Sequence, residues 1–520
     1  MMKSLATLVA TVALALTTAL GACGDHGALP DAARADAGFP DATIPPPVGE
    51  FPAGFLWGTA IAPYQVEGGL HASDWHQWEA RCEVCSGEHA DDGPDFWNRY
   101  EDDLANAAAL HTGALRLGID WSRIFPTAAS FPASPDLDAV RRYHDILAAA
   151  RAHGLEPMVT LHHFVTPIWL HDLEPKTAKA GWEDPAIIDA FAVWADFCAR
   201  EFGAEVDWWI TINEPLAYVA GGYLSGAFPP GAGLDIDRGI LVVMNMIEAH
   251  ARAYDALHAG DSVDADADGA PALVSIAQHM SAFRPATPGD EESERATEML
   301  RYLLNRLFLD AVVYGALDRN FDMDTDDAGE QVDPMLAGRL DYVGVNYYRL
   351  LLGAYIGENN FPLIGLPFGN DLHQQGVDLP STDFGWPIYA PGFREVLDEA
   401  AVYGLPIVIT ENGLADGDDT LRPRFLLEHL YELARAIQDG LDIRGYYHWS
   451  LIDNFEWASG YCPRFGLYHV DFESADRTRR AGEGAEVYRR IIDANTVPVE
   501  LYGVYPRYPL PSTLCPRVGL

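Results

Sequence analysis

The sequence has few basic residues. Across 520 residues, 34 lysines and arginines stand against 77 aspartates and glutamates, and the formal net charge is −43. A field of this sign repels phosphate backbones and anionic headgroups, which argues against nucleic-acid binding and favours a neutral small-molecule ligand. Apolar residues are not scarce: they make up 49% of the chain, enough for a large core and against disorder over most of its length.

The apolar run near the N-terminus is too short to cross a membrane. It covers residues 5–20 and follows Lys3, the pattern of a secretory signal peptide. The run ends in Leu-Gly-Ala-Cys at 20–23, which resembles the lipobox of bacterial lipoproteins, whose cysteine is acylated and becomes the first residue. We therefore expect a signal peptide over 1–22 and a lipid on Cys23; the alternative is an ordinary small-residue cleavage site.

Residues 23–50 contain little that could form a core. They are rich in Ala, Asp, Pro and Gly and nearly free of bulky apolar side chains, so we expect an extended tether. With the lipid, this segment predicts an exported protein that touches a bacterial membrane only through its N-terminus. Gly24 stands where an aspartate favours retention in the inner membrane of some bacteria, so the outer membrane is slightly preferred; a periplasmic or secreted protein is the alternative.

Cysteine is sparse, with six in the chain. In an oxidising compartment, Cys82 and Cys85 could form a local disulfide, and Cys462 could pair with Cys515. A zinc site would need a second pair of cysteines at suitable spacing, and the sequence has none. Cys198 lies in an apolar helical stretch and is expected to be a buried free thiol.

After residue 50, short β-rich runs alternate with amphipathic helical stretches such as 139–153, which Gly154 follows as a C-cap. This alternation predicts an α/β fold with a parallel sheet. Eight strands close a (β/α)8 TIM barrel, so we expect one barrel domain over 51–500, a loop insertion at 354–395 and a C-terminal extension over 501–520. The predicted strands are 55–60, 114–119, 156–163, 206–214, 272–278, 341–348, 406–413 and 443–450.

In such barrels the active site lies at the C-terminal ends of the strands. Carboxylates, amides and aromatic side chains occur at that end of five predicted strands, and a purely structural barrel has no need of them. They are His162 and His163 on the third strand, Asn213 and Glu214 on the fourth, Asn346 and Tyr348 on the sixth, Glu411 and Asn412 on the seventh, and His448 and Trp449 on the eighth.

Two of these residues, Glu214 and Glu411, would lie nearly opposite each other across the barrel. Cleavage of a glycosidic bond needs two carboxyl groups, and a separation of about 5 Å retains configuration whereas a wider gap inverts it. We expect Glu214 to be protonated as the acid, in surroundings that disfavour charge, and Glu411 to be ionised beside the cation of Arg116. Taken singly, each glutamate could be a loop or capping residue, and Arg116 a salt bridge at the rim.

Sugar binding needs an apolar surface for the ring and planar partners for its hydroxyl groups. Trp449, Glu456 and Trp457 offer both within nine residues of sequence. Ordinary core packing of the tryptophans is the alternative.

These residues resemble those of glycoside hydrolase family 1, which contains β-glucosidases and β-galactosidases. The resemblance covers about residues 51–495, and eight segments in the family's order make it specific. The segments are FLWGTAIAPYQVEGG at 55, LRLGIDWSRIFP at 115, TLHHF at 160, TINEP at 211, DYVGVNYY at 341, GWPIY at 385, ITENG at 409 and GYYHWSLIDNFEWASGYCPRFGLYHVDF at 445.

The resemblance implies an exo-acting retaining β-glycosidase that hydrolyses terminal β-D-glycosyl residues through a covalent glycosyl-enzyme. A β-glucosidase is the first choice, with β-galactosidase or β-fucosidase activity alongside it. Glu214 would be the acid/base and Glu411 the nucleophile. By the same resemblance, Arg116 and Tyr348 hydrogen-bond the nucleophile, Asn213 holds the sugar 2-hydroxyl, Gln65, His163, Glu456 and Trp457 hold other hydroxyls, Trp449 is a stacking floor, Phe465 lines the pocket and Asn346 borders it.

Some residues depart from the family pattern. Ala62 and Pro63 replace the usual Ser-Ala, and the common HWDLP is HFVTP at 163–167, which puts glycone preference in doubt but leaves both glutamates intact. Glu456, with no lysine after it in its segment, argues against the branch that cleaves 6-phosphorylated sugars, and Glu214 argues against the plant thioglucosidases. Two alternatives share the pocket: a surface glycan-binding protein without turnover, and a transglycosidase that uses the same residues.

No cofactor is expected. Asp264, Asp266 and Asp268 have the spacing of a calcium loop, but Ser275 stands at the twelfth position, where a bidentate glutamate would bind. Solvated acidic turns are therefore favoured over a structural calcium ion.

Overall fold

The computed structural model describes residues 44–81, 86–174, 180–267, 269–319, 321–325, 332–353, 379–505 and 508. The chain divides into Met1–Asp41 and Ala42–Leu520, and every residue described here belongs to the second unit. Within the described ranges, no helix combines the length and the apolar character that a membrane crossing requires. The expected signal peptide, the lipid site at Cys23, the calcium candidate Asp268, and Cys82, Cys85 and Cys515 lie outside the described residues.

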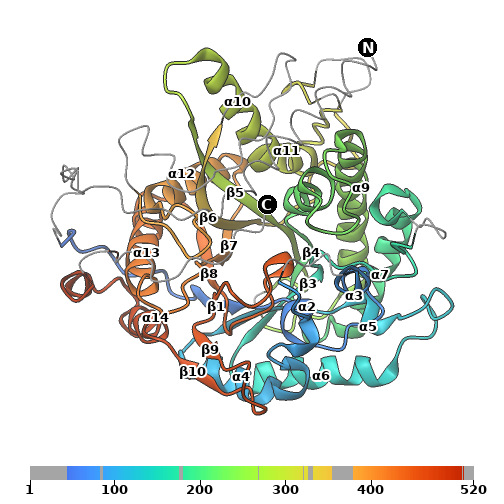
Figure 1. Ribbon diagram of the computed structural model, residues 1–520, viewed down its shortest axis with the longest axis horizontal. Coiled ribbons are helices and arrows are strands. Elements are labelled where there is room, and N and C mark those ends of the chain that lie inside the picture. Colours follow the sequence, from blue (N-terminus) through green and yellow to red (C-terminus); the bar gives the residue numbers. More distant parts are fainter. Residues whose placement is uncertain are drawn as a thin grey trace, which may run out of the picture. The chain divides into compact units, whose positions relative to one another are not determined.

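Eight parallel strands form a closed barrel in which each strand pairs with its neighbour in sequence and β8 pairs with β1 (Figure 1). The predicted (β/α)8 fold is confirmed, and all eight predicted strands are present. Their bounds are β1 Leu56–Ala60, β2 Ala114–Gly118, β3 Glu156–His162, β4 Trp208–Asn213, β5 Leu273–Pro285, β6 Val343–Gly353, β7 Ile407–Asn412 and β8 Ile443–Trp449.

Helices surround the barrel, and a small antiparallel pair, β9 Tyr468–Val470 and β10 Arg479–Ala481, follows it (Figure 1). Strands β2, β4 and β7 are buried along their whole length, because side chains fill the barrel interior and helices cover its outer face. The α-helices are α2 Pro63–Val66, α3 Asp74–Ala80, α4 Phe96–Ala109, α5 Trp121–Ile124, α6 Leu137–Ala152, α7 Ala186–Phe202, α8 Pro215–Val219, α9 Ile236–Gly260, α10 Glu291–Arg301, α11 Leu307–Tyr314, α12 Ala390–Ala400, α13 Arg422–Gln438 and α14 Glu483–Ala494.

The structure differs from the predicted boundaries in two places inside the barrel. Strands β5 and β6 are longer than expected and stay paired as far as Pro285 and Gly353. The loop predicted over 354–395 ends earlier, because α12 begins at Ala390. Helix α6 matches its prediction closely, and Gly154 beyond it has a φ of 76°, a left-handed conformation that favours glycine.

Both ends of the predicted domain also extend further than expected. Within the predicted tether, the carbonyl oxygens of Pro46 and Val48 accept hydrogen bonds from Tyr431 and Thr496 of the barrel unit. At the other end, the Tyr502 hydroxyl donates to a carbonyl oxygen of α13. Residues 46–48 and the start of the predicted C-terminal extension therefore pack against the barrel unit.

Arg422, at the start of α13, is a fully buried cation that joins two loops at the C-terminal rim. Its Nε donates to Asp419 at 2.6 Å. Its terminal nitrogens donate to four carbonyl oxygens, two in the loop after β7 and two in the loop after β8. These belong to Leu414, Asp416, Arg464 and Phe465.

We expect Arg422→Met to lower the free energy of unfolding by about 3–5 kcal/mol, because it leaves the buried Asp419 carboxylate without its cation and removes one donor from each of the four carbonyl oxygens. Urea unfolding measures the loss. The control is Arg435→Met on the same helix, where the half-exposed arginine pairs with Glu432 at 3.1 Å and a change of at most about 1 kcal/mol is expected. Equal losses in the two variants would contradict the role given to Arg422.

Candidate active site

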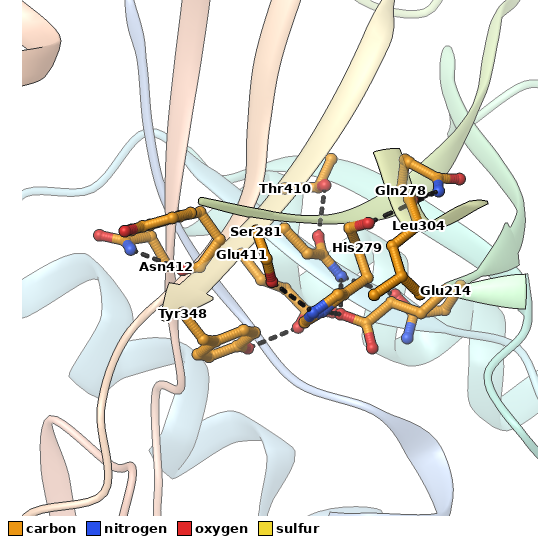
Figure 2. A network of polar contacts seen from close by, with 12 residues as sticks. Glu214, Gln278, His279, Ser281, Leu304, Tyr348, Thr410, Glu411 and Asn412 are labelled. Carbon is orange, nitrogen blue, oxygen red and sulfur yellow. Dashed lines mark hydrogen bonds and ion pairs between the residues drawn. The ribbon is translucent and has the colours of Figure 1, made fainter. Parts of the chain in front are cut away.

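Two buried glutamates stand at the C-terminal ends of β4 and β7. Glu214 directly follows β4 and has a φ of 43°, a left-handed conformation that is strained for a residue with a side chain. Glu411 is the penultimate residue of β7. In Figure 2 their side chains extend toward one another. Parallel strands thus bring together two carboxyl groups that are far apart in the sequence.

Glu411 is held between a cation and a phenol. Its Oε1 accepts a hydrogen bond from Arg116 Nη1 at 2.5 Å, and its Oε2 accepts one from the Tyr348 hydroxyl at 2.6 Å. Arg116 is buried on β2 and also donates to the Thr160 hydroxyl at 3.0 Å and to Asn213 Oδ1 at 2.7 Å. The guanidinium is therefore fixed on several sides, and both oxygens of Glu411 have a donor.

Glu214 is held from β5 and β6. Asn346 Nδ2 donates to Glu214 Oε1 at 2.8 Å and to Asn213 Oδ1 at 3.1 Å. The Thr410 hydroxyl donates to Asn346 Oδ1 at 2.6 Å, which turns the amide nitrogen toward the glutamate (Figure 2). His279 Nδ1 lies 3.4 Å from Glu214 Oε1. A continuous polar chain therefore runs from Glu411 through Arg116, Asn213 and Asn346 to Glu214.

The two carboxyl groups titrate as an interacting pair. Burial opposes ionisation of Glu214, but the charge of His279 and hydrogen bonds from His279 and Asn346 hold its pKa below the usual value. Burial raises the pKa of Glu411 to about 7; Arg116 lowers it and the charge of Glu214 raises it. The sequence predicts surroundings that disfavour a charge on Glu214 and favour one on Glu411. This prediction is wrong for the ligand-free site, where the pKa of Glu214 is lowered and that of Glu411 is raised. The reason is that His279 lies beside Glu214, a contact that the sequence did not reveal.

A third carboxyl group, Glu456, lies in the loop after β8. Its Oε2 accepts hydrogen bonds from Gln65 at 3.2 Å and Asn454 at 3.0 Å. Burial raises the pKa of Glu456 to about 8; the hydrogen bond from Asn454 lowers it and the charges of Glu411 and Glu214 raise it. The electrostatic effect of both glutamates places Glu456 in the same site.

Aromatic rings surround this site. The rings of Trp449 and Trp457 stack against His163, with centroids 5.8 Å and 6.0 Å away. His163 Nε2 lies 3.2 Å from Asn213 Nδ2, so the histidine joins the polar chain to the tryptophans. Phe465 lies edge-on to Tyr348, with centroids 6.2 Å apart. The structure therefore brings together the predicted residues Gln65, Arg116, His163, Asn213, Glu214, Asn346, Tyr348, Glu411, Trp449, Glu456, Trp457 and Phe465.

Four further residues contribute that the sequence did not single out. Thr160, Thr410 and Asn454 lie inside motifs that were recognised, but their hydrogen bonds depend on strands that are distant in the chain. His279 was missed because the fifth strand was expected to end at residue 278, whereas β5 continues through His279 to Pro285.

The other predicted features lie away from this site. Asp266 comes within 4.8 Å of Glu156 and Asp207, at the N-terminal ends of β3 and β4, and Asp264 accepts a hydrogen bond from the Gly269 amide at 3.0 Å. The preference for solvated acidic turns over a calcium ion there stays a prediction. Cys198 is a buried free thiol, as expected, and Cys462 is disulfide-bonded. Cys515, its predicted partner, lies outside the described residues.

A closed (β/α)8 barrel with two buried carboxyl groups and stacked aromatic rings at its C-terminal rim defines a glycoside hydrolase. Residues 48–497 match the sequence profile of glycosyl hydrolase family 1, and the chain belongs to this family. It is an O-glycosyl hydrolase.

Among its relatives is a β-galactosidase of Pyrococcus woesei, 34% identical over 86% of this chain and 98% of the relative. A 6-phospho-β-galactosidase of Staphylococcus aureus is 32% identical over 82% and 95% of the two chains. Of the solved structures, a β-glycosidase from Pyrococcus horikoshii superposes with a TM-score of 0.75, 31% identity and coverage of 89% and 99%. A family 1 β-glucosidase from Thermotoga maritima gives a TM-score of 0.74, 30% identity and coverage of 86% and 99%.

The contact between His279 and Glu214 predicts a pH effect. In His279→Phe, Glu214 loses a neighbour that favours its ionised form, so its pKa rises and the acid stays protonated to higher pH. The alkaline limb of the kcat/KM profile should therefore move to higher pH. His144→Phe, at a half-exposed histidine on α6, is the control and should leave the limb in place. An unmoved or lowered limb in His279→Phe would refute the effect.

Proposed function

We propose that the protein is an exo-acting retaining β-glycosidase that removes terminal non-reducing β-D-glycosyl residues. The observation that carries this proposal is the polar chain between Glu411 and Glu214, which gives the two carboxyl groups different partners. Glu411 faces a guanidinium and a phenol, as a carboxylate nucleophile requires, while Glu214 faces an amide and an imidazole. A β-glucosidase is the first assignment, with β-galactosides and β-fucosides as further substrates.

The proposed reaction has two displacements. In the first, a carboxylate oxygen of Glu411 attacks the anomeric carbon, the bond to the leaving oxygen breaks, and Glu214 gives its proton to that oxygen. In the second, Glu214 takes a proton from water, the water oxygen attacks the anomeric carbon, and Glu411 leaves as carboxylate. Two inversions at one carbon give net retention.

The electrostatic coupling of the pair suits this change of role. The charge of Glu214 raises the pKa of Glu411, and the reverse effect must hold as well. While Glu411 is ionised, its charge therefore favours the protonated acid form of Glu214. When Glu411 becomes an ester, that charge disappears and His279 and Asn346 favour the ionised base form.

The glycone is proposed to be unphosphorylated, unlike the substrate named for the Staphylococcus aureus relative. Glu456 and Gln65 offer a carboxyl and an amide group to sugar hydroxyls. A phosphate would meet the carboxyl group of Glu456, and no lysine occurs between 445 and 472 to neutralise it.

Replacing the two glutamates tests the mechanism. With nitrophenyl β-glucoside, galactoside and fucoside, Glu411→Ala should lose at least about 10⁴-fold in kcat, because no nucleophile remains. Azide should restore part of the rate and give the α-glycosyl azide. Glu214→Ala should instead give the β-glycosyl azide, since the glycosyl-enzyme still forms.

Glu248→Ala, at a half-exposed glutamate on α9, is the control and should keep the parent rate. Parent-like turnover in Glu411→Ala would refute its role as nucleophile. A parent protein that binds these glycosides without turnover would favour the glycan-binding alternative, and glycosyl transfer to added alcohols in place of water would favour the transglycosidase.

We also infer that the protein is exported and held to a membrane, with a preference for the outer membrane, by a lipid on Cys23. The inference rests on the apolar run over 5–20 and the Leu-Gly-Ala-Cys that ends it. Cys23→Ser should abolish incorporation of labelled palmitate and move the protein from the membrane to the soluble fraction of cells. Unchanged labelling in this variant would exclude Cys23 as the lipid site.

A further inference from the structure

An arginine beside the catalytic pair has no polar partner among the residues that the structure describes. Arg349 follows Tyr348 in β6, and it makes no hydrogen bond or ion pair with any described residue. Its Nε is enclosed without a hydrogen-bond partner, although the side chain as a whole is half-buried. Two arginines near the rim, Arg116 and Arg422, each have a carboxylate partner within 2.6 Å. Buried cations without such a partner are unfavourable, so Arg349 needs an explanation.

A β-bulge places this arginine. Met280 pairs with Tyr347 and Ala282 pairs with Leu350, so β6 has two residues, Tyr348 and Arg349, opposite a single residue of β5. Bulges of this kind redirect side chains, and regular alternation would send neighbouring residues to opposite faces of the strand. Here both residues reach one tryptophan, as the following contacts show.

Trp386, in the loop before α12, packs against both side chains. Its ring centroid lies 5.8 Å from that of Tyr348 and 4.4 Å from Arg349 Cζ. Stacking uses the flat face of a guanidinium and leaves its N–H edge free. Trp386 therefore holds the cation in place without satisfying its hydrogen-bond donors.

The surroundings of Arg349 place it on the leaving-group side of the reaction. Arg349 lies three residues beyond Asn346 on β6, and Asn346 donates to Glu214 Oε1 at 2.8 Å. Burial lowers the pKa of Arg349 to about 10, and the charge of Glu214 acts in the opposite direction. Glu214 is the group that protonates the leaving oxygen, whereas Gln65 and Glu456, proposed to hold the glycone, lie in a different part of the polar network. A group next to Glu214 is therefore next to the aglycone.

We propose that Arg349 and Trp386 form an anion-binding subsite for the aglycone, so that the preferred substrates carry an acidic group on the leaving portion. The inference rests on the proposed function, since it deepens the substrate class of the same site. A carboxylate, sulfate or phosphate on the aglycone would accept the free N–H groups of Arg349, while an aromatic or sugar ring would lie against Trp386. This combination is what an acidic phenolic or uronic aglycone presents.

The overall charge of the chain opposes this assignment at long range. At −43, the protein repels an approaching anion, so an acidic aglycone has to be held by a fixed cation within the site. Assays at about 0.15 M salt reduce the distant repulsion, because charges separated by more than about 8 Å are then largely screened. The contact at Arg349 is short-range and survives these conditions.

Binding of thioglycosides tests the subsite without any need for turnover. The two probes are 3-carboxyphenyl 1-thio-β-D-glucoside and the neutral 3-carbamoylphenyl analogue, and calorimetry measures their Kd. The parent should bind the acid at least about tenfold more tightly than the amide, which corresponds to about one charge-assisted hydrogen bond. In Arg349→Met this preference should vanish while amide binding stays unchanged, which shows that the variant is folded. Binding of a 3-sulfophenyl probe shows whether the subsite accepts a tetrahedral anion as well as a planar carboxylate.

Arg284→Met is the matched control. Arg284 also stacks on an aromatic ring, Tyr389, but it pairs with Glu395 and lies outside the polar network of the two catalytic glutamates. This variant should keep the preference for the acid probe. An acid preference that persists in Arg349→Met, or a parent that prefers the amide or does not discriminate, would overturn the subsite.

Turnover assays distinguish a failure of the anion subsite from a failure of the proposed hydrolase function. With the corresponding oxygen-linked glycosides, the ratio of kcat/KM for acid over amide should fall about tenfold or more in Arg349→Met, because the variant loses much more activity on the acid than on the amide. A parent that hydrolyses no glycoside but binds the acid thioglycoside through Arg349 would refute the hydrolase and keep the subsite. A parent that hydrolyses the amide with no preference for the acid would support the hydrolase and refute the subsite.

Discussion

A single buried guanidinium holds the catalytic rim together. Arg116 on β2 donates to a threonine on β3, an asparagine on β4 and a glutamate on β7, and so connects four strands of the barrel through one side chain. A buried cation is tolerated only when its donors are satisfied, which forces these acceptors to converge. The nucleophile is therefore fixed by the same contact that satisfies the arginine. The need to keep this charge paired links stability to catalytic geometry.

The second carboxyl group, that of Glu214, is connected to Arg116 indirectly, through Asn213 and Asn346. Asn346 reaches Glu214 because Thr410, the neighbour of the nucleophile on β7, fixes the orientation of its amide. The acid and the nucleophile are thus coupled by hydrogen bonds as well as by charge. A change of protonation on one alters the pKa of the other, and the proposed mechanism uses this coupling when Glu214 acts first as acid and then as base.

Sequence was a good guide to the fold and to the position of the two glutamates, and a poorer guide to their surroundings. Eight β-rich runs that alternate with helical stretches are sufficient to predict a closed barrel, and strand ends locate Glu214 and Glu411 because parallel strands share a rim. The predicted pKa order of the pair is wrong, because it depends on His279, and this residue lies in the part of β5 that continues from the predicted end at residue 278 to Pro285. The bulge that turns Arg349 toward Trp386 was also missed. A bulge arises from the register between two strands, and one strand alone carries no sign of it.

The central claim is that Glu411 forms a covalent bond to the anomeric carbon. A 2-deoxy-2-fluoroglucoside with an activated leaving group tests it most directly, because the fluorine slows the second displacement and lets the glycosyl-enzyme accumulate. Mass spectrometry should show one fluoroglycosyl unit per chain, and peptide mapping should place it on Glu411. A label on another residue, or a fluorosugar released by the enzyme with inverted configuration and no label, would contradict the account.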